Sequence, residues 1–136
     1  MARQSLDDLE GNVGTPATST DALVVTKCQR LRKKAVDDFT IEDLRVMISQ
    51  EIGLKYLMPP AILALEREPM AEGNLHPGDL LASVIAHEKW LKKNPELSER
   101  VLAIAKRAAT GMGQDGFGGE LLLFIARGSG KPKKKA

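Results

Sequence analysis

The chain has 136 residues, of which 43% are hydrophobic and 28% charged, a composition typical of one globular domain with a core of its own. No apolar run approaches the roughly 20 residues that a membrane-spanning helix needs, and the single cysteine, Cys28, excludes an intrachain disulfide. Because the first ten residues also carry acid where a signal peptide would be apolar, we expect a soluble protein of the cytoplasm.

The net charge of +2 is distributed unevenly along the chain. Residues 1–36 hold six basic and four acidic side chains, and residues 81–136 hold eleven basic and five acidic ones. Residues 37–80 hold nine acidic against three basic side chains, a net of −6. An acidic surface in this middle segment would favour association with a cationic partner.

The first third of the chain predicts one short and one longer helix. Residues 5–10 can form a single helical turn, and residues 11–20 have the turn-forming composition of a linker. Asp21 then suits the N-cap of a helix over 22–33. The inner stripe of that helix is expected to consist of Val24, Cys28 and Leu31.

Thr40 gives the clearest helix start in the sequence. Asp43, three residues later, makes a variant of the capping box in which Asp replaces the usual Glu or Gln. Gly53 is a natural stop for this helix. Its apolar face comprises Ile41, Leu44, Met47, Ile48 and Ile52.

The next two helices are predicted on either side of a connector rich in Pro and Gly, residues 69–78. Two consecutive prolines, Pro59 and Pro60, do not both fit inside a regular helix, so we expect the first of these helices to begin at them and to end near Glu68. Asp79 is expected to cap the second.

In the last third, Asn94-Pro95-Glu96 predicts the start of a further helix. Residues 111–119 are too rich in glycine to hold a fixed conformation without support, and 120–127 suit a last short helix. The expected fold is all-α, a compact bundle of about five to six short helices. We divide the chain into an N-terminal extension (1–20), a helical domain (21–127) and a disordered basic tail (128–136).

Groups for catalysis or metal binding are few. His76 and His87 fall in different predicted elements, and neither has Cys28 or an acidic residue at metal-ligand spacing. Cys28 lies on the expected inner face of its helix, where a free cysteine is usually an inert small hydrophobe. We therefore expect no catalytic residue, no metal and no cofactor.

Two basic clusters offer an alternative function, the binding of nucleic acid through phosphate contacts. Their structural explanations are the C-terminus of a helix, where cations are favoured, and a solubilising tail. The clusters consist of Lys27, Arg30, Arg32, Lys33 and Lys34, and of Lys131, Lys133, Lys134 and Lys135.

Part of the acid in the middle segment is explained by a helix N-terminus, which favours acidic residues around Thr40. The rest would suit a cationic partner if the carboxylates converge on one surface. Aromatic residues are frequent hot spots in interfaces, so Tyr56 and Trp90 are candidates too, although either side chain can equally belong to the core. The candidate partner-binding residues are Glu51, Tyr56, Glu66, Glu68, Glu72 and Asp79.

Several motifs together resemble the immunity proteins of bacterial contact-dependent growth inhibition systems, over about residues 5–105. The most specific part of the resemblance is the block 38–81. The motifs are Ser5-Leu-Asp-Asp-Leu-Glu-Gly11, Cys28-Gln-Arg-Leu-Arg-Lys-Lys34, Asp38-Phe-Thr-Ile-Glu-Asp-Leu-Arg45, Ile52-Gly-Leu-Lys-Tyr-Leu57, Pro69-Met-Ala-Glu-Gly73 and Pro77-Gly-Asp-Leu-Leu81.

The resemblance implies a protein without enzymatic activity that binds the C-terminal toxin domain delivered by a neighbouring cell, commonly a nuclease. It does not identify the toxin-binding residues, because the motifs can serve the fold. It agrees with an acidic surface, since a nuclease needs a cationic groove that such a surface can occupy.

Overall fold

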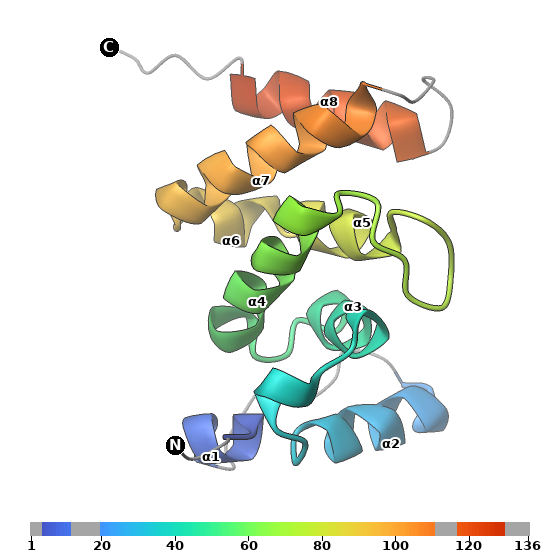
Figure 1. The fold of residues 1–136 in the computed structure, drawn as a ribbon. Helices are drawn as coiled ribbons and strands as arrows, with labels where there is room; N and C mark the ends of the chain where they lie inside the picture. Colours follow the sequence, from blue (N-terminus) through green and yellow to red (C-terminus); the bar gives the residue numbers. More distant parts are fainter. Residues whose placement is uncertain (1–3, 12–19, 111–116, 130–136) are drawn as a thin grey trace.

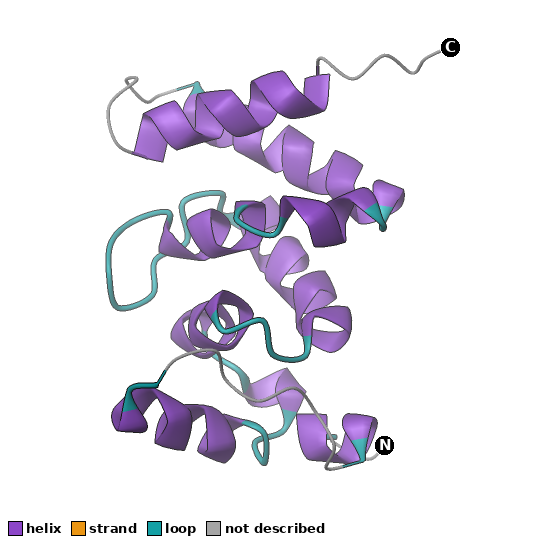
Figure 2. Ribbon diagram, turned by 180° about the vertical axis from the view of Figure 1, so that it is seen from behind, coloured by secondary structure: helices purple, strands orange, loops and turns teal. Residues whose placement is uncertain are grey.

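The fold is a stack of α-helices that rises from the N-terminal to the C-terminal end of the chain (Figure 1). The structure, a computed structural model, describes residues 4–11, 20–110 and 117–129. These residues contain eight α-helices and one 3₁₀ turn, and the view from behind shows helices joined by loops without a strand (Figure 2). The elements are α1 (Leu6–Glu10), α2 (Ala22–Leu31), η1 (Val36–Asp38), α3 (Ile41–Ser49), α4 (Leu54–Arg67), α5 (Asp79–Ile85), α6 (Glu88–Lys92), α7 (Pro95–Ala109) and α8 (Phe117–Ser129).

The centre of the stack is formed by α3, α4, α5 and α7. Helix α3 packs on α5, and α4 contacts α3, α5 and α7. The two ends are built on this centre, with α2 against α3 and with α6 and α8 against α7. The all-α prediction is confirmed for the described residues, whereas the expected five to six helices were too few, because the short helices α1 and α6 are separate elements.

Two of the local start signals in the sequence, at Thr40 and at Asp21, work as predicted. Thr40 accepts a hydrogen bond from the Asp43 amide at 3.1 Å, and the Asp43 carboxylate accepts one from the Thr40 amide at 3.1 Å. Ser5 and Asp8 make the same reciprocal pair at the start of α1. The Asp21 side chain caps α2, as expected. Each cap satisfies backbone donors that the first turn leaves without intrahelical partners.

Helix α4 corrects the prediction at the two prolines. It begins at Leu54 and contains Pro59 and Pro60. Each proline lacks the N–H that would bond the carbonyl four residues earlier, yet the helix continues because its apolar face is fully buried in the core. The buried residues of α4 are Leu57, Met58, Ala61, Ile62 and Leu65.

Gly53 lies before α4 rather than ending α3, which corrects a second expectation. It is the N-cap residue of α4, with φ of 64°, and α3 has already ended at Ser49. A Cβ atom at Gly53 would lie 2.8 Å from Leu6, whose side chain is completely buried. Gly53 therefore permits the contact that ties α1 to the centre of the stack.

The C-terminal helix is longer than expected. Helix α8 begins at Phe117 and thus includes two glycines of the segment that we expected to lack a fixed conformation. Leu121 and Phe124 of α8 are buried in the core, and this packing on α7 compensates for the low helix propensity of glycine. The rest of the glycine-rich segment (111–116), most of the predicted linker (12–19) and the lysine tail (130–136) lie outside the described residues.

Candidate partner-binding loop and its support

Part of the acid in the middle segment is neutralised by cations within the fold. Four of its nine acidic residues lie within ion-pair distance of a described cation. Three of the cations come from the flanking basic segments of the chain, so the structure balances part of the uneven charge of the sequence. The pairs are Glu42 with Lys27 and Arg45, Asp43 with Lys34, Glu66 with Arg100, and Asp79 with Arg45.

Asp79 and Glu66 do not offer free carboxylates to a partner, contrary to expectation. Asp79 is buried, with 3% of its surface exposed. Glu66 accepts two hydrogen bonds from Arg100, at 2.7 and 2.8 Å, which lower the pKa of the Glu66 carboxyl. Asp79 is engaged inside the fold, and Glu66 joins α4 to α7 through an ion pair at the surface.

The three other predicted carboxylates are exposed, and no described cation lies within ion-pair distance of them. Glu51 precedes α4 and Glu68 follows it. The 14 residues of this helix separate them by about 20 Å at 1.5 Å per residue. Only Glu68 and Glu72 share one segment, the α4–α5 loop, which we define as residues 68–78. The predicted carboxylates therefore do not form a single surface.

The aromatic candidates lie partly in the core. Tyr56 and Trp90 are half-buried and pack against the core residues. The Tyr56 hydroxyl donates to the Leu9 carbonyl at 3.5 Å, a long hydrogen bond that joins α4 to α1. Tyr56 therefore has a structural role, while its remaining exposed surface is still open to a partner.

Asp79 supports the α4–α5 loop instead of capping a helix. One of its carboxylate oxygens accepts from the Gly73 amide at 2.7 Å. The other accepts from the Leu75 amide at 3.0 Å and, more weakly, from the His76 amide at 3.4 Å. The N-cap position of α5 belongs to Gly78, with φ of 85°. The buried carboxylate thus binds backbone donors of a surface loop.

Glu42 of α3 supports the same loop. It accepts from the Asn74 amide at 2.8 Å and from Arg45 Nε at 2.8 Å, and Lys27 lies 3.6 Å away. The hydrogen bonds from Arg45 and Asn74, together with the charges of Arg45 and Lys27, lower the pKa of Glu42 to about 2. Glu42 therefore stays charged at any physiological pH.

The loop lies so close to these carboxylates that one position requires glycine. A Cβ atom at Gly73 would lie 2.5 Å from the Glu42 carboxylate and 3.2 Å from that of Asp79. The loop is also closed on itself, because the Gly78 amide donates to the Met70 carbonyl at 3.1 Å and Glu72 pairs with Pro77 in an isolated bridge. Its backbone is fixed by contacts both within the loop and beneath it.

The outer side of the loop is exposed. Figures 1 and 2 show it projecting from the side of the stack next to α3 and α5. Leu75, at its centre, has 63% of its surface exposed. Glu72, Asn74 and His76 around it are exposed as well. The loop therefore presents one large apolar side chain among polar ones on a fixed backbone.

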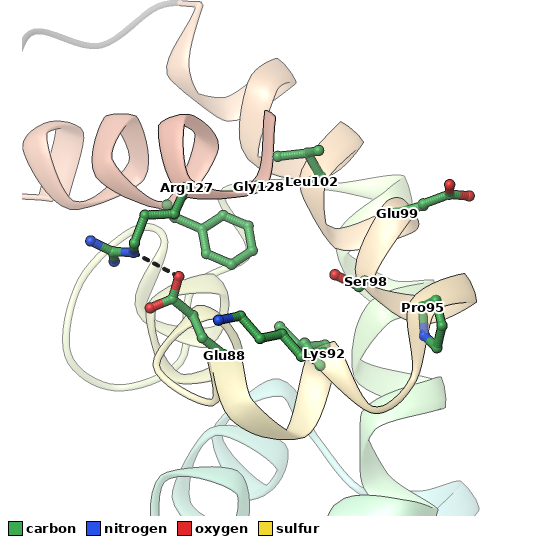
Figure 3. Close-up of a pocket in the computed structure, with 10 residues that line it drawn as sticks. Glu88, Lys92, Pro95, Ser98, Glu99, Leu102, Arg127 and Gly128 are labelled. Carbon is green, nitrogen blue, oxygen red and sulfur yellow. Dashed lines mark hydrogen bonds and ion pairs between the residues drawn. The ribbon is translucent and has the colours of Figure 1, made fainter. Parts of the chain in front are cut away.

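A pocket of about 340 Å³ lies between α6, α7 and α8 (Figure 3). Leu91, Leu102 and Phe124 contribute apolar walls, and Arg127 Nε donates to the Glu88 carboxylate at 2.9 Å at its edge. No histidine or cysteine is among its lining residues. The pocket can accommodate apolar groups, and Lys92, Ser98 and Glu99 add polar side chains to its wall.

Cys28 and His87, which were considered as catalytic groups, make contacts within the fold. Cys28 is buried, and burial raises the pKa of its thiol. His87 Nε2 lies 2.7 Å from the Ile48 carbonyl. The described residues contain no cluster of three or more potential ligands that could hold a metal ion. No helix in the described ranges has the length and apolarity to cross a membrane.

The first basic cluster is largely occupied by ion pairs. Lys27 lies 3.6 Å from Glu42, Arg32 bonds Asp7 at 2.8 Å, and Lys34 bonds Asp43 at 2.6 Å. Arg30 and Lys33 remain exposed. The lysines at 131 and 133–135 lie outside the described residues. Three of the five cations of this cluster are thus engaged in ion pairs within the fold.

The sequence patterns did not identify Glu42 or Leu75 as candidate site residues. The glycines at 73 and 78 and the acid at 79 were a local signal for a loop bound by a carboxylate. By contrast, the contact of Glu42 with Asn74 joins residues 32 positions apart, a separation that no local pattern reveals.

Comparison with known proteins places most of the chain in one family. Residues 8–101 match the sequence model of a family described as CDI immunity proteins. The match includes the α4–α5 loop with both supporting carboxylates, and it ends within α7, before α8. No curated protein and no solved structure gives a significant match.

Proposed function

The chain belongs to the CDI immunity proteins, and on this premise we propose that it neutralises the toxin of its own contact-dependent growth inhibition system by binding the toxin domain. The family match carries this proposal. A fixed and exposed loop supports it, because a preformed surface loses little freedom on association. In this proposal the protein acts in the cytoplasm as a stoichiometric inhibitor and not as an enzyme.

We further propose that the toxin is a nuclease and that exposed carboxylates of this chain contact its basic side chains. Glu68 and Glu72 of the α4–α5 loop support this contact, and Glu51 and the exposed surface of Tyr56 are secondary candidates. Asp79 and Glu66 act indirectly, by holding the loop and by joining α4 to α7. Such charge complementarity raises the association rate more than the affinity.

Growth rescue tests the proposed function. The protein is co-expressed with the toxin domain of the adjacent reading frame, and separately with the toxin domain of an unrelated system. We expect growth to be restored with the adjacent toxin alone. Death in both cases, with the protein present in soluble form, would contradict the immunity role.

Charge reversal tests the electrostatic contact. Glu72→Lys is compared with Glu99→Lys, because both carboxylates are exposed without a described ion-pair partner and both variants change the net charge equally. We expect Glu72→Lys to slow association with the toxin about tenfold at low salt and less at high salt, while Glu99→Lys has a minor effect. Equal rates for the two variants would refute the carboxylate contact without touching the immunity role.

A further inference from the structure

We propose that Leu75 is the apolar anchor through which this chain binds its toxin, and that the toxin presents an apolar pocket rimmed by basic side chains. This inference rests on the proposed function and names the surface that performs it.

The support beneath Leu75 sets it apart from the other exposed leucines. Exposed single leucines are common on protein surfaces and need no explanation by themselves. The other four lie on helices, where the regular backbone fixes their position. Leu75 lies in a loop, and its own amide is bound by the buried Asp79 at 3.0 Å. The other exposed leucines are Leu23, Leu63, Leu122 and Leu123.

The loop is held by two carboxylates whose removal from water is energetically unfavourable. Burying a carboxylate is unfavourable unless hydrogen bonds and opposite charges compensate for the lost hydration. Here Asp79 and Glu42 come from two different helices, share Arg45 as a cation, and direct their oxygens at the amides of residues 73–76. The same carboxylates would be better hydrated at the surface, so their position is explained by the fixed loop that they produce.

The surroundings of Leu75 define the partner. The exposed side chain of Glu72 lies in the same loop, and that of Glu68 at its start, and no described cation neutralises either one. An apolar side chain in an acidic setting matches an apolar pocket with lysine or arginine at its edge. A nuclease domain that contacts phosphates has basic residues of this kind.

Leu75→Ala tests the anchor, with Leu123→Ala as the matched control. Leu123 is exposed to a similar degree, 58% against 63%, and lies on α8 outside the family match. Titration calorimetry with the purified toxin domain of the adjacent reading frame measures both affinities. We expect Leu75→Ala to weaken binding at least tenfold and Leu123→Ala to change it less than twofold.

Asp79→Asn provides a second variant that leaves Leu75 in place. It removes the carboxylate charge under the loop, so we expect weaker binding together with faster amide exchange in residues 73–76. An affinity of Leu75→Ala within twofold of the wild type overturns the anchor, whereas the immunity role then stands if the wild type still binds and rescues growth. Absence of binding by the wild type removes the proposed function, and the anchor falls with it.

Discussion

Two carboxylate–cation arrangements in this protein use the same chemistry in different surroundings. Under the α4–α5 loop, the side chains of Asp79 and Glu42 are only 1% and 12% exposed, and together they accept hydrogen bonds from four loop amides, those of residues 73–76. At the edge of the pocket, the side chains of Glu88 and Arg127 are 32% and 57% exposed and bind each other. The first arrangement holds backbone in place, and the second joins two side chains in contact with water.

Burial and backbone contacts decide what an ion pair contributes to stability. Exposed pairs contribute little, because water solvates both partners nearly as well when they are apart. A buried carboxylate that accepts from backbone amides leaves donors unsatisfied when it is removed. The supported loop also lies within the family match, whereas Arg127 lies beyond it.

Asp79→Ala should have the largest effect on stability. Three loop amides lose their acceptor and Arg45 loses one of its partners, so we expect the free energy of unfolding to fall by about 3 kcal/mol. Urea denaturation of the wild type and of the variant measures the difference. A loss below 0.5 kcal/mol, on the order expected for a surface change, would show that the carboxylate does not hold the loop.

Acid should weaken the same region through Glu42. Its pKa of about 2 lies below the ordinary value of 4.5, so the charged carboxylate stabilises the folded state above pH 4.5. That stabilisation, on the order of 2 kcal/mol, is lost as the pH falls towards 2. Comparison with Glu42→Gln isolates this contribution from the other acidic groups. The stability difference between the two proteins should shrink between pH 5 and pH 2, and a constant difference would contradict the assigned pKa.

Gly73→Ala should destabilise the protein by about 1–2 kcal/mol, because the added methyl group forces the loop away from Glu42. Asn74→Ala, at the next position, removes an exposed side chain and should change stability by less than about 0.5 kcal/mol. Thermal unfolding of both variants checks the contrast. Equal melting temperatures would mean that the loop can shift to accommodate the methyl group without a loss of stability.

Glu88→Gln should have the smallest effect. Because the Arg127 guanidinium remains hydrated when its partner loses its charge, we expect no measurable change in the urea midpoint. A shift as large as that of Asp79→Ala would erase the contrast between the two arrangements and show that the pocket edge is as important to the fold as the loop support.

Most of the helix starts could be predicted, because the signals at Thr40, Asp21 and Asn94 act over three or four residues. The start of α4 could not, because burial of its apolar face overrides the local preference of Pro59 and Pro60. The length of α8 has the same cause, since Leu121 and Phe124 pack on the core.

The candidate site could be predicted only in part. Sequence patterns identified the acidic middle segment and the connector between α4 and α5. They could not show that Lys34 and Arg100 neutralise acids 9 and 34 residues away, or that Asp79 turns inward to bind the loop. Charge segregation in a sequence therefore indicates internal pairing as readily as a charged surface.

Amide hydrogen exchange of the toxin complex shows whether the α4–α5 loop is the surface that binds the toxin. We expect binding to slow exchange in residues 69–78, while residues 117–129 of α8 exchange as they do in the free protein. Protection confined to α8 and the pocket, with the α4–α5 loop unchanged, would contradict this expectation.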